Sequence, residues 1–469
     1  MTTTGWRPAT RRPIRRDPPH SLIPEESQPV AVARRGLRGL SSLQPLRHRD
    51  FALVWSAALV SNIGSWVQTV AIGVLVTQLT GQARWTGLVA AAAFLPIGLL
   101  SPVGGVMADR ADRRRLLLLT TLGEMGFATL LAVLAATDSV TPTNLAAVAL
   151  GGGCMAAFGF PAYQAILPDL VAKDDLLGAI SLSSAQYNLG RVIGPALAGL
   201  ILAAGSYTFA FVVNAVSFGA VFVAIALVRL PPPRPDPDET GGIWRRIVTG
   251  ARGGWAEPGC QAAILAIAVA ALLLSPFIAL IPAVAVKLFD AGERGTSILV
   301  TAQGVGAVTG ALSMAPLARR FGRRRVLMAD LVVLPGLLVL YALAPSLPLA
   351  AVALAGVGAG YIGVLSGLGT VVQLRAPTVL RARILSLYMV ALGVVYPVGA
   401  VIQGALGDHF GLRRVTMAAA AVFLAVVLVA GAVRPDLAAA LDDPERQPVP
   451  GRGSAPAPKT GPGPTEMIG

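Results

Sequence analysis

The sequence predicts an all-α membrane protein with twelve transmembrane helices in two pseudo-symmetric bundles of six. Three observations lead to this fold class. Of the 469 residues, 54% are hydrophobic and only 13% are charged, and the mean hydropathy is +0.68. Long apolar segments follow one another along most of the chain, and a basic loop recurs at the same place in both halves. A soluble domain of ordinary size cannot bury such an excess of apolar residues.

Each predicted span has about 20 mainly apolar residues, the length that a helix needs to cross a bilayer. The first six spans lie at 51–79, 86–108, 116–136, 144–166, 179–203 and 208–228. The second six lie at 260–286, 296–316, 326–344, 348–372, 385–406 and 415–433. Most of the loops between them are only a few residues long.

Polar, proline-containing segments set the expected domain boundaries. The one long interior break begins LPPPRPDPDETGG, which is an extended, linker-like sequence. Within it, 241–255 can form an amphipathic helix on the membrane surface, or a plain turn. The two terminal segments are expected to be disordered cytoplasmic tails. The expected organisation is a tail at 1–46, a bundle at 47–228, a cytoplasmic linker at 229–259, a bundle at 260–433 and a tail at 434–469.

The net charge of +14 can indicate nucleic-acid binding or membrane topology. Most of the 38 Lys and Arg residues fall in the tails and in the loops after even-numbered spans. The loops on the other side carry only Arg84, Lys287, Arg294, Arg413 and Arg414. Because basic loops stay on the cytoplasmic side, we expect a multi-pass protein of the inner (cytoplasmic) membrane with both termini in the cytoplasm. Anionic lipid then accounts for the charge, and nucleic acid is not expected as a partner.

Neither a metal nor an organic cofactor is expected. The two cysteines, Cys154 and Cys260, lie in apolar runs outside any CxxC pattern, and the three histidines do not cluster. An intramembrane enzyme would need clustered carboxylates or histidines in the spans, and a channel would need polar or charged rings. Since the sequence has neither pattern, an enzyme and a channel are both disfavoured.

A repeat relates the two halves of the chain. The loop after the second span reads GVMADRADRRR at 105–115, and the loop after the eighth reads LARRFGRRR at 317–325. Asp109 aligns with Arg319 and Arg115 aligns with Arg325, which indicates an internal duplication. Parallel six-helix repeats are a known transporter plan, with the substrate site between them near the membrane midplane.

At these residues the sequence resembles the major facilitator superfamily. Segment 105–115 is similar to the superfamily signature between helices 2 and 3, except that Asp112 stands where the usual pattern has glycine. Segments LRHRDFALVW, PAYQAILPDLV and GPALAG resemble the branch that contains macrolide-efflux proteins and the enterobactin exporter, among the drug:proton antiporters. The resemblance covers 47–434 and implies transport driven by a proton gradient. The signature residues are Gly105, Asp109, Arg110, Arg113, Arg114 and Arg115.

The resemblance also implies a conformational latch, in which Asp109 meets the N-terminal end of the eleventh helix at about 381–386. Free N–H groups and the helix dipole stabilise a carboxylate there by about 0.3–1 kcal/mol. Such a contact exists in one arrangement of the halves only, so it can bias alternating access. The alternative is that these charges only fix the topology. Arg319 occupies the position of Asp109 in the second loop, so the latch is not symmetric.

The fifth span is similar to a Gly-x-x-x-Gly-Pro motif associated with proton-coupled exporters, with Ala198 in place of one glycine of the final pair. Small residues let helices approach closely in lipid, and proline can kink a helix. Helix packing is therefore the expected role, and a role in coupling is implied by the resemblance alone. The fourth span lacks the arginine signature of many proton-coupled exporters, which weakens that implication. The motif residues are Gly190, Gly194, Pro195 and Gly199.

Charged residues within spans are costly and indicate function by default. Glu124 lies in the third span and Arg191 in the fifth. Because burial disfavours the charged form of a carboxyl, Glu124 is a candidate for proton coupling, with a structural or interfacial role as the alternative. Arg191 is its candidate partner, or an anchor for an anionic substrate. Asp330 lies near a span end beside three arginines, where an interfacial ion pair is expected.

Further polar residues are candidates for a central cavity, although each can instead satisfy a neighbouring helix. These candidates are Asn62, Gln68, Gln164, Asn188, Gln303 and Tyr396. Cavities for large apolar molecules also need aromatic walls. The aromatic candidates are Trp66, Phe94, Phe158 and Phe277.

The expected function is a monomeric secondary transporter that exports a small amphipathic, drug-like molecule by alternating access, coupled to proton entry. The first alternative is a siderophore or secondary-metabolite exporter with the same machinery. The second is a nutrient-uptake symporter, against which the motif in the fifth span argues. The expected partners are a small-molecule substrate and the lipid bilayer.

Overall fold

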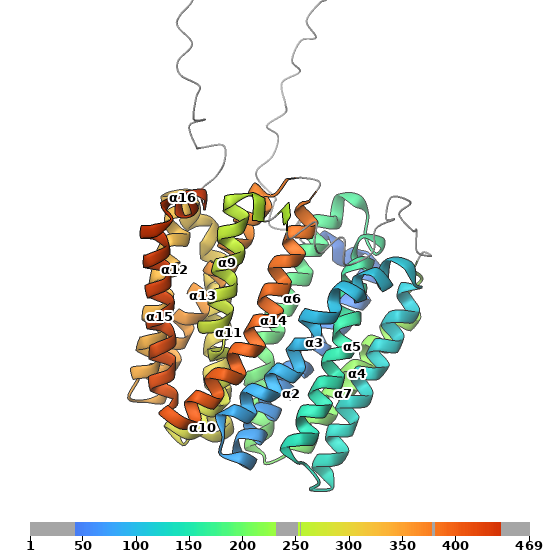
Figure 1. Ribbon diagram of the computed structural model, residues 1–469. Coiled ribbons are helices and arrows are strands. Elements are labelled where there is room, and N and C mark those ends of the chain that lie inside the picture. Colours follow the sequence, from blue (N-terminus) through green and yellow to red (C-terminus); the bar gives the residue numbers. More distant parts are fainter. Residues whose placement is uncertain (1–42, 231–251, 254, 378–379, 442–469) are drawn as a thin grey trace, which may run out of the picture. The chain divides into compact units, whose positions relative to one another are not determined.

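The computed structural model describes residues 43–230, 252–253, 255–377 and 380–441, and these residues form an all-helical structure (Figure 1). The helices of the N-terminal half are α2 (Arg49–Thr80), α3 (Ala83–Arg110), α4 (Arg113–Ala136), α5 (Pro142–Ile166), α6 (Leu176–Ala203) and α7 (Tyr207–Leu227). Those of the C-terminal half are α9 (Pro258–Leu273), α10 (Phe277–Phe289), α11 (Gly292–Phe321), α12 (Arg323–Leu343), α13 (Leu347–Arg375), α14 (Arg381–Phe410) and α15 (Leu412–Val433). The shorter helices are η1 (Gln44–Arg47), η2 (Leu167–Asp169), η3 (Lys173–Asp175) and α16 (Pro435–Ala440).

Among the described residues, 11 helical segments are long and apolar enough to cross a membrane, with α9 and α10 forming one segment. The twelve predicted spans differ from this set at α6, which has 28 residues but a more polar composition. Ser183, Gln186 and Arg191 are buried in α6, which packs between α2 and α11. A helix whose polar residues face protein rather than lipid needs fewer apolar residues.

The predicted span at 260–286 corresponds to the single candidate span Pro258–Phe289, within which the chain breaks between α9 and α10. Pro276 has no backbone N–H and cannot continue the helical hydrogen bonds. The break is stabilised by Ser275, whose backbone N–H donates to the carbonyl of Ala270 at 2.8 Å. The Ser275 hydroxyl also lies 2.9 Å from the hydroxyl of Tyr361 on α13.

Two predicted regions fall partly or wholly outside the described residues. Of the first tail, 1–46, the structure describes only the end, where η1 lies. The predicted second tail, 434–469, begins with the six-residue helix α16, and residues from 442 onward are not among those described. Most of the predicted surface helix at 241–255 also lies outside the described part.

The two halves repeat one pattern of helix contacts. In the N-terminal half, α2 packs against α6, α3 against α5, and α4 against α7. In the C-terminal half, the corresponding pairs are α9 with α14, α11 with α13, and α12 with α15. With α9 and α10 counted as one span, the first helix of each half packs with the fifth, the second with the fourth and the third with the sixth. This repeated pattern is expected of a duplicated six-helix unit.

Two helix pairs make the most extensive contacts between the halves, namely α3 with α14 and α6 with α11 (Figure 1). The α3–α4 and α11–α12 loops, with the arginines of 113–115 and 323–325, lie at what we call the basic end. The α2–α3, α10–α11 and α14–α15 loops lie at the opposite end. A site between the halves can therefore be closed at either end by contacts of these four helices.

Candidate functional site: a cavity between the halves

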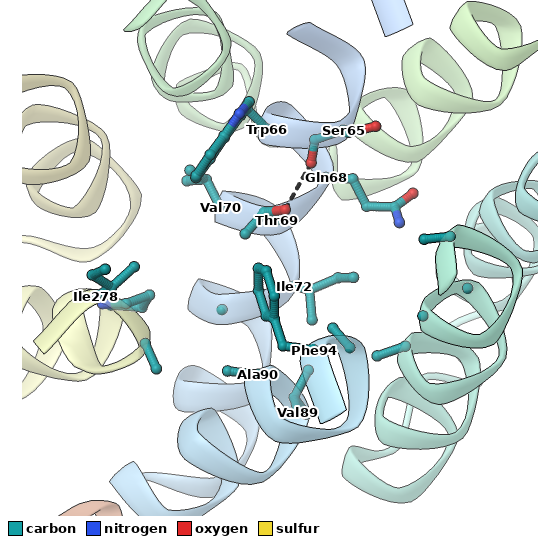
Figure 2. A pocket seen from close by; sticks show the side chains of 18 of the residues that line it. Ser65, Trp66, Gln68, Thr69, Val70, Ile72, Val89, Ala90, Phe94 and Ile278 are labelled. Atoms are coloured by element: carbon teal, nitrogen blue, oxygen red, sulfur yellow. Dashed lines mark hydrogen bonds between the residues drawn. The ribbon is translucent and has the colours of Figure 1, made fainter. Parts of the chain in front are cut away.

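A cavity of about 300 Å³ lies inside the helix bundle and is lined by both halves (Figure 2). One wall is formed by α2, α3, α4, α5 and α7 of the N-terminal half, and the other by α10, α11 and α14. Small-molecule sites in proteins have volumes of about 300–1,000 Å³. The cavity is thus large enough for a small organic molecule and touches helices that belong to different halves.

Aromatic side chains form much of the cavity wall. They are Trp66, Phe94, Phe127, Phe218 and Tyr396. The rings of Phe94 on α3 and Tyr396 on α14 meet edge to face, with centroids 5.6 Å apart and planes at 79°. Figure 2 shows Trp66 and Phe94 on one side of the cavity and Ile278 of α10 on the other. The wall is suited to a molecule with a substantial apolar surface.

A few polar groups interrupt this apolar wall. Gln68 of α2 lies on the wall, and its Oε1 accepts a hydrogen bond of 2.9 Å from Nδ2 of Asn214 on α7. Gln303 of α11 is only 1% exposed, and within the described part of the chain its Nε2 has no hydrogen-bond partner. A buried donor without a partner is costly, so Gln303 contributes an unsatisfied polar group beside the cavity.

Glu124 of α4 supplies a carboxylate to the cavity wall, and it is the only Asp or Glu among the lining residues. No hydrogen bond or ion pair joins Glu124 to another residue within the described part of the chain. A carboxylate in an apolar environment needs a proton or a cation as its partner. The prediction that Glu124 is the coupling site stays a prediction.

Arg191, the candidate partner of Glu124, is placed elsewhere in the N-terminal half. It is buried on α6, and its Cζ lies over the ring of Trp66, 5.7 Å from the centroid. Its Nε has no hydrogen-bond partner among the described residues. The structure forms no Glu124–Arg191 ion pair, because α4 packs on α5 and α7 whereas α6 packs on α2 and α11.

Of the six polar cavity candidates, three lie on the wall and three do not. Those on the wall are Gln68, Gln303 and Tyr396. Asn62 instead donates to Oε1 of Gln186 at 2.8 Å and joins α2 to α6. Asn188 donates to a carbonyl of its own helix, that of Ser184, and Gln164 is exposed. These three lie outside the wall of this cavity.

The aromatic candidates divide in the same way. Trp66 and Phe94 line the cavity, whereas Phe158 and Phe277 pack in hydrophobic cores. Among the wall residues that sequence reasoning missed are Phe127, Asn214 and Phe218. Helical spacing was the available signal: Phe127 follows Glu124 by one turn, and Phe218 follows Asn214 by one turn, so each pair shares a helix face.

The small-residue motif of α6 lies where this helix contacts two others, α2 and α11. A Cβ on Gly190 would lie 2.8 Å from Cβ of Asn62, and one on Gly194 would lie 2.8 Å from the carbonyl oxygen of Ile63. A Cβ on Gly199 would lie 2.7 Å from Cβ of Ser297 on α11. The motif therefore sits where α6 approaches both α2 and α11.

Pro195 completes this motif at the contact between the halves. The hydroxyl of Ser297 on α11 donates to the carbonyl of Pro195. Because Pro195 has no N–H, it also leaves the carbonyl of Arg191 without its usual helical donor. A Cβ on Gly304 of α11 would lie 3.0 Å from that oxygen, so α11 approaches α6 closely along this stretch.

Two arginines of the superfamily-like signature bind carbonyl groups at helix C-termini. Arg113 donates to the carbonyl of Ala108 at 3.1 Å and forms an ion pair of 3.0 Å with Asp169. Arg114 donates to the carbonyl of Ile225 at 3.2 Å. The last carbonyls of a helix have no partner within it, and cations there also interact favourably with the dipole. These side chains thus hold together α3, α4, the segment after α5, and α7 at the basic end.

The departure from the signature at Asp112 has a structural reason. Its carboxylate accepts hydrogen bonds from the backbone N–H groups of Arg114 and Arg115, at 3.0 and 3.2 Å. Asp112 is therefore the N-cap of α4, a position that favours Asp over most residues. Arg110 and Arg115 are exposed, and a Cβ on Gly105 would meet no atom within 4 Å.

Asp109 lies on α3, but its side chain is not among those that the structure describes. Its contact with the N-terminal end of α14 therefore stays a prediction. We expect Asp109→Asn to leave membrane insertion intact and to reduce transport, since the helix N-terminus stabilises a charged carboxylate. Transport by vesicles with equal amounts of each protein checks this, with Asp112→Asn, which retains an N-cap, as the control. Unimpaired transport by Asp109→Asn would contradict the predicted contact of Asp109 with the N-terminal end of α14.

At the opposite end, a different carboxylate joins the halves. Asp408 of α14 accepts hydrogen bonds from the backbone N–H groups of Ala83 and Arg84, at 2.7 and 2.9 Å. These groups belong to the first turn of α3. Lys287 of α10 lies 2.7 Å from the same carboxylate. A carboxylate at a helix N-terminus is favoured by the free N–H groups and the dipole, so Asp408 stabilises contact between α14 and α3.

A second polar contact joins the halves at this end. Oε1 of Glu293 on α11 accepts hydrogen bonds of 2.8 Å from Nε2 of Gln78 on α2 and from the hydroxyl of Tyr207 on α7. Together with Asp408, Glu293 holds the halves together beyond the cavity on the side away from the basic end.

Sequence reasoning missed Asp408, although a signal was present. The segment GALGDHFGLRR at 404–414 repeats the spacing of the signature at 105–115, with an acid four residues after a glycine and an arginine pair beyond it. Asp408 thus has the position near the end of α14 that Asp109 has near the end of α3.

The expected interfacial ion pair of Asp330 is wrong. Its Oδ2 is buried against Gly363 of α13 and has no hydrogen-bond partner among the described residues. The side chain points into the C-terminal half rather than toward the arginines that precede it. No group of three or more His, Cys, Asp or Glu residues that could hold a metal ion occurs in the described ranges.

Two repeated six-helix halves around a shared cavity are the plan of a class of multi-pass membrane transporters. Residues 40–462 match the transmembrane secretion effector family, and the chain belongs to this family. The predicted membership of the major facilitator superfamily is confirmed.

Two relatives are named for what they export, and they match different shares of this chain. The multidrug efflux pump Tap of Mycolicibacterium fortuitum is 29% identical over 388 residues, which are 81% of this chain and 94% of Tap. The enterobactin exporter EntS of Shigella boydii is 32% identical over 199 residues, which are 41% of this chain and 46% of EntS. The predicted resemblance to the enterobactin-exporter branch is thus confirmed.

A solved structure confirms the fold class. A bacterial homolog of the human lysosomal transporter Spinster, crystallised in an inward-facing and unoccupied conformation, matches with a TM-score of 0.65. The match covers 85% of this chain and 97% of that chain at 16% sequence identity. The protein is therefore a multi-pass transporter of the major facilitator superfamily, and its family is one of transporters rather than enzymes.

Proposed function

We propose that this protein exports a small amphipathic molecule from the cytoplasm by alternating access, coupled to proton entry. The observation that carries the proposal is the aromatic cavity of about 300 Å³ between the halves, which has one carboxylate and few other polar groups on its wall. Apolar walls with a few placed polar groups are typical of sites for amphipathic molecules.

The proposed orientation places the basic end in the cytoplasm, together with both termini. The arginines of the α3–α4 and α11–α12 loops support it, because short cytoplasmic loops carry an excess of Lys and Arg. In this orientation the Asp408 and Glu293 contacts lie on the outer side. The protein works as a monomer in this proposal, since each chain contains both halves of the site.

Alternating access follows from opposed contacts at the two ends. The Asp408 and Glu293 contacts hold the halves together at the outer end, and they must break for cargo to leave there. The Asp109 latch would form at the basic end when the outer end opens. Since α3 and α14 each carry an acid near the C-terminal end, each can meet the N-terminus of the other, in turn.

Proton coupling is assigned to Glu124 in this proposal. Its position on the wall supports the assignment, as does the lack of a partner for its carboxylate among the described residues. A group that exchanges a proton must be reachable from one side at a time, and a cavity between moving halves provides this. A proton taken up from the outside and released to the cytoplasm would drive export.

The relatives favour export over uptake, because Tap is named a multidrug efflux pump and EntS an enterobactin exporter. The test is the accumulation of ethidium and of an iron-free siderophore in cells with and without the protein, with and without a protonophore. We expect the protein to lower accumulation of at least one compound, and the protonophore to abolish the difference. Increased accumulation in expressing cells would overturn export, and an effect that persists with the protonophore would overturn proton coupling.

A further inference from the structure

We infer that the cavity takes amphipathic monocations, such as lipophilic amines or onium ions, and rejects anionic chelators. The inference rests on the proposed function, since it names the class of molecule that the cavity binds for export. It decides between the two kinds of cargo that the relatives carry.

The charge on the wall is the first argument. Glu124 is the one acidic residue among the lining residues, and no Lys or Arg is among them. Transfer of a charge from water into an apolar site is costly unless the charge is paired there. A monocation finds its partner in Glu124, whereas an anion finds none and is repelled. A second positive charge would also be unpaired, so the site favours a single charge.

The aromatic wall is the second argument. Cations are attracted to the faces of aromatic rings within about 6 Å of the centroid, most strongly where water is excluded. Phe127 follows Glu124 by one helical turn, and Phe94, Phe218 and Tyr396 complete the wall. A cation bound in this cavity therefore has aromatic rings on the surrounding wall, and these rings also cover an attached apolar group.

The polar groups of the two walls differ, which orients the cargo. Gln68 and Asn214 of the N-terminal half bind each other, so their amides are partly satisfied. Gln303 of the C-terminal half keeps its Nε2 buried, without a partner among the described residues. The inferred cargo therefore has its cationic end at α4, where Glu124 lies on the wall.

Arg191 is the nearby basic residue, and its placement disfavours an anion site. It is not a lining residue, and its guanidinium lies over the ring of Trp66, which is one. The guanidinium charge instead interacts with the ring face.

Two ions of nearly equal size and shape but opposite charge test the inference, namely tetraphenylphosphonium and tetraphenylborate. Binding to the purified full-length protein in detergent is measured by equilibrium dialysis, with protein-free micelles subtracted. We expect wild-type protein to bind tetraphenylphosphonium and Glu124→Gln to bind it about 10- to 100-fold more weakly, the loss of one charge-assisted contact. Asp330→Asn, which neutralises a carboxylate away from the cavity, is the matched control and should bind like wild type.

Three results would overturn the inference. The first is tetraphenylphosphonium binding that Glu124→Gln leaves unchanged in a variant that elutes as a folded monomer. The second is tighter specific binding of tetraphenylborate by wild-type protein. The third is tetraphenylborate binding that Arg191→Gln abolishes, which would assign an anionic cargo.

Failure of this inference is distinguishable from failure of the proposed function. If cells export only an anionic compound, the proposed function stands and the monocation site falls. If tetraphenylphosphonium binding depends on Glu124 but no compound is exported, the site stands and the exporter proposal falls.

Discussion

Gly98→Ala is expected to separate α3 from α14 and to reduce transport severely. A Cβ on Gly98 would lie 2.6 Å from the carbonyl carbon of Gly393 and 2.9 Å from the backbone nitrogen of Val394. A Cβ on Gly393 would in turn lie 2.9 Å from Cα of Gly98. Because backbone atoms cannot move aside as a side chain can, the two helices must shift apart.

The expected magnitude follows from the cost of overpacking, which is about 1–3 kcal/mol. Applied to the contact between the halves, this shifts the equilibrium between their arrangements by about 5- to 150-fold. Thermal unfolding and transport of the purified variant check the prediction. Gly336→Ala is the matched control, because a Cβ at Gly336 meets no atom within 4 Å. Wild-type stability and transport in Gly98→Ala would show that the crossing of α3 and α14 is not the contact that the halves need.

Asp408→Ala is expected to open the end of the bundle away from the basic end. The substitution removes the acceptor for the N–H groups of Ala83 and Arg84 and leaves the Lys287 ammonium without its partner. Hydrogen bonds to charged groups are worth about 1.5–3 kcal/mol, so the open arrangement should gain about 10- to 150-fold in population. Asp408→Asn retains one acceptor oxygen and should have a smaller effect.

Thiol labelling measures this opening. The reporter is Ile72→Cys on the cavity wall, in a protein whose native Cys154 and Cys260 are replaced by alanine. A membrane-impermeant maleimide added outside the cells should label the reporter faster in Asp408→Ala than in the parent. Asp112→Ala, which removes an N-cap at the basic end, should leave the labelling rate unchanged. Equal rates in Asp408→Ala and the parent would remove Asp408 from the closure.

The spans were predictable because a run of about 20 mainly apolar residues is typical of a transmembrane helix. The predicted span at 51–79 corresponds to α2, and the one at 385–406 lies within α14. The break at Pro276 was missed, since a proline in a long apolar run can kink a helix or end it, and tertiary contacts decide. Here the hydrogen bonds of Ser275 to Ala270 and Tyr361 stabilise the end of α9.

The site was predictable only in part. Helical periodicity shows which side of a helix a residue lies on, but not whether that side meets the cavity or another helix. Gln68 and Asn62 are both polar residues of α2, yet one lines the cavity and the other binds Gln186 of α6. Likewise, Arg113 and Arg114 were expected to serve a latch or the topology, and they bind helix ends that are distant in sequence.

Cargo movement driven by a pH gradient tests the central claim most directly. The purified protein is reconstituted into liposomes, with valinomycin and equal potassium on both sides to hold the membrane potential at zero. Molecules whose basic end faces the bath should concentrate tetraphenylphosphonium in an acidic lumen, because protons leave as the cargo enters. Protein-free liposomes and Glu124→Gln should show no such accumulation. Accumulation that requires an alkaline lumen would indicate symport, and accumulation equal to that of protein-free liposomes in both gradients would contradict the account.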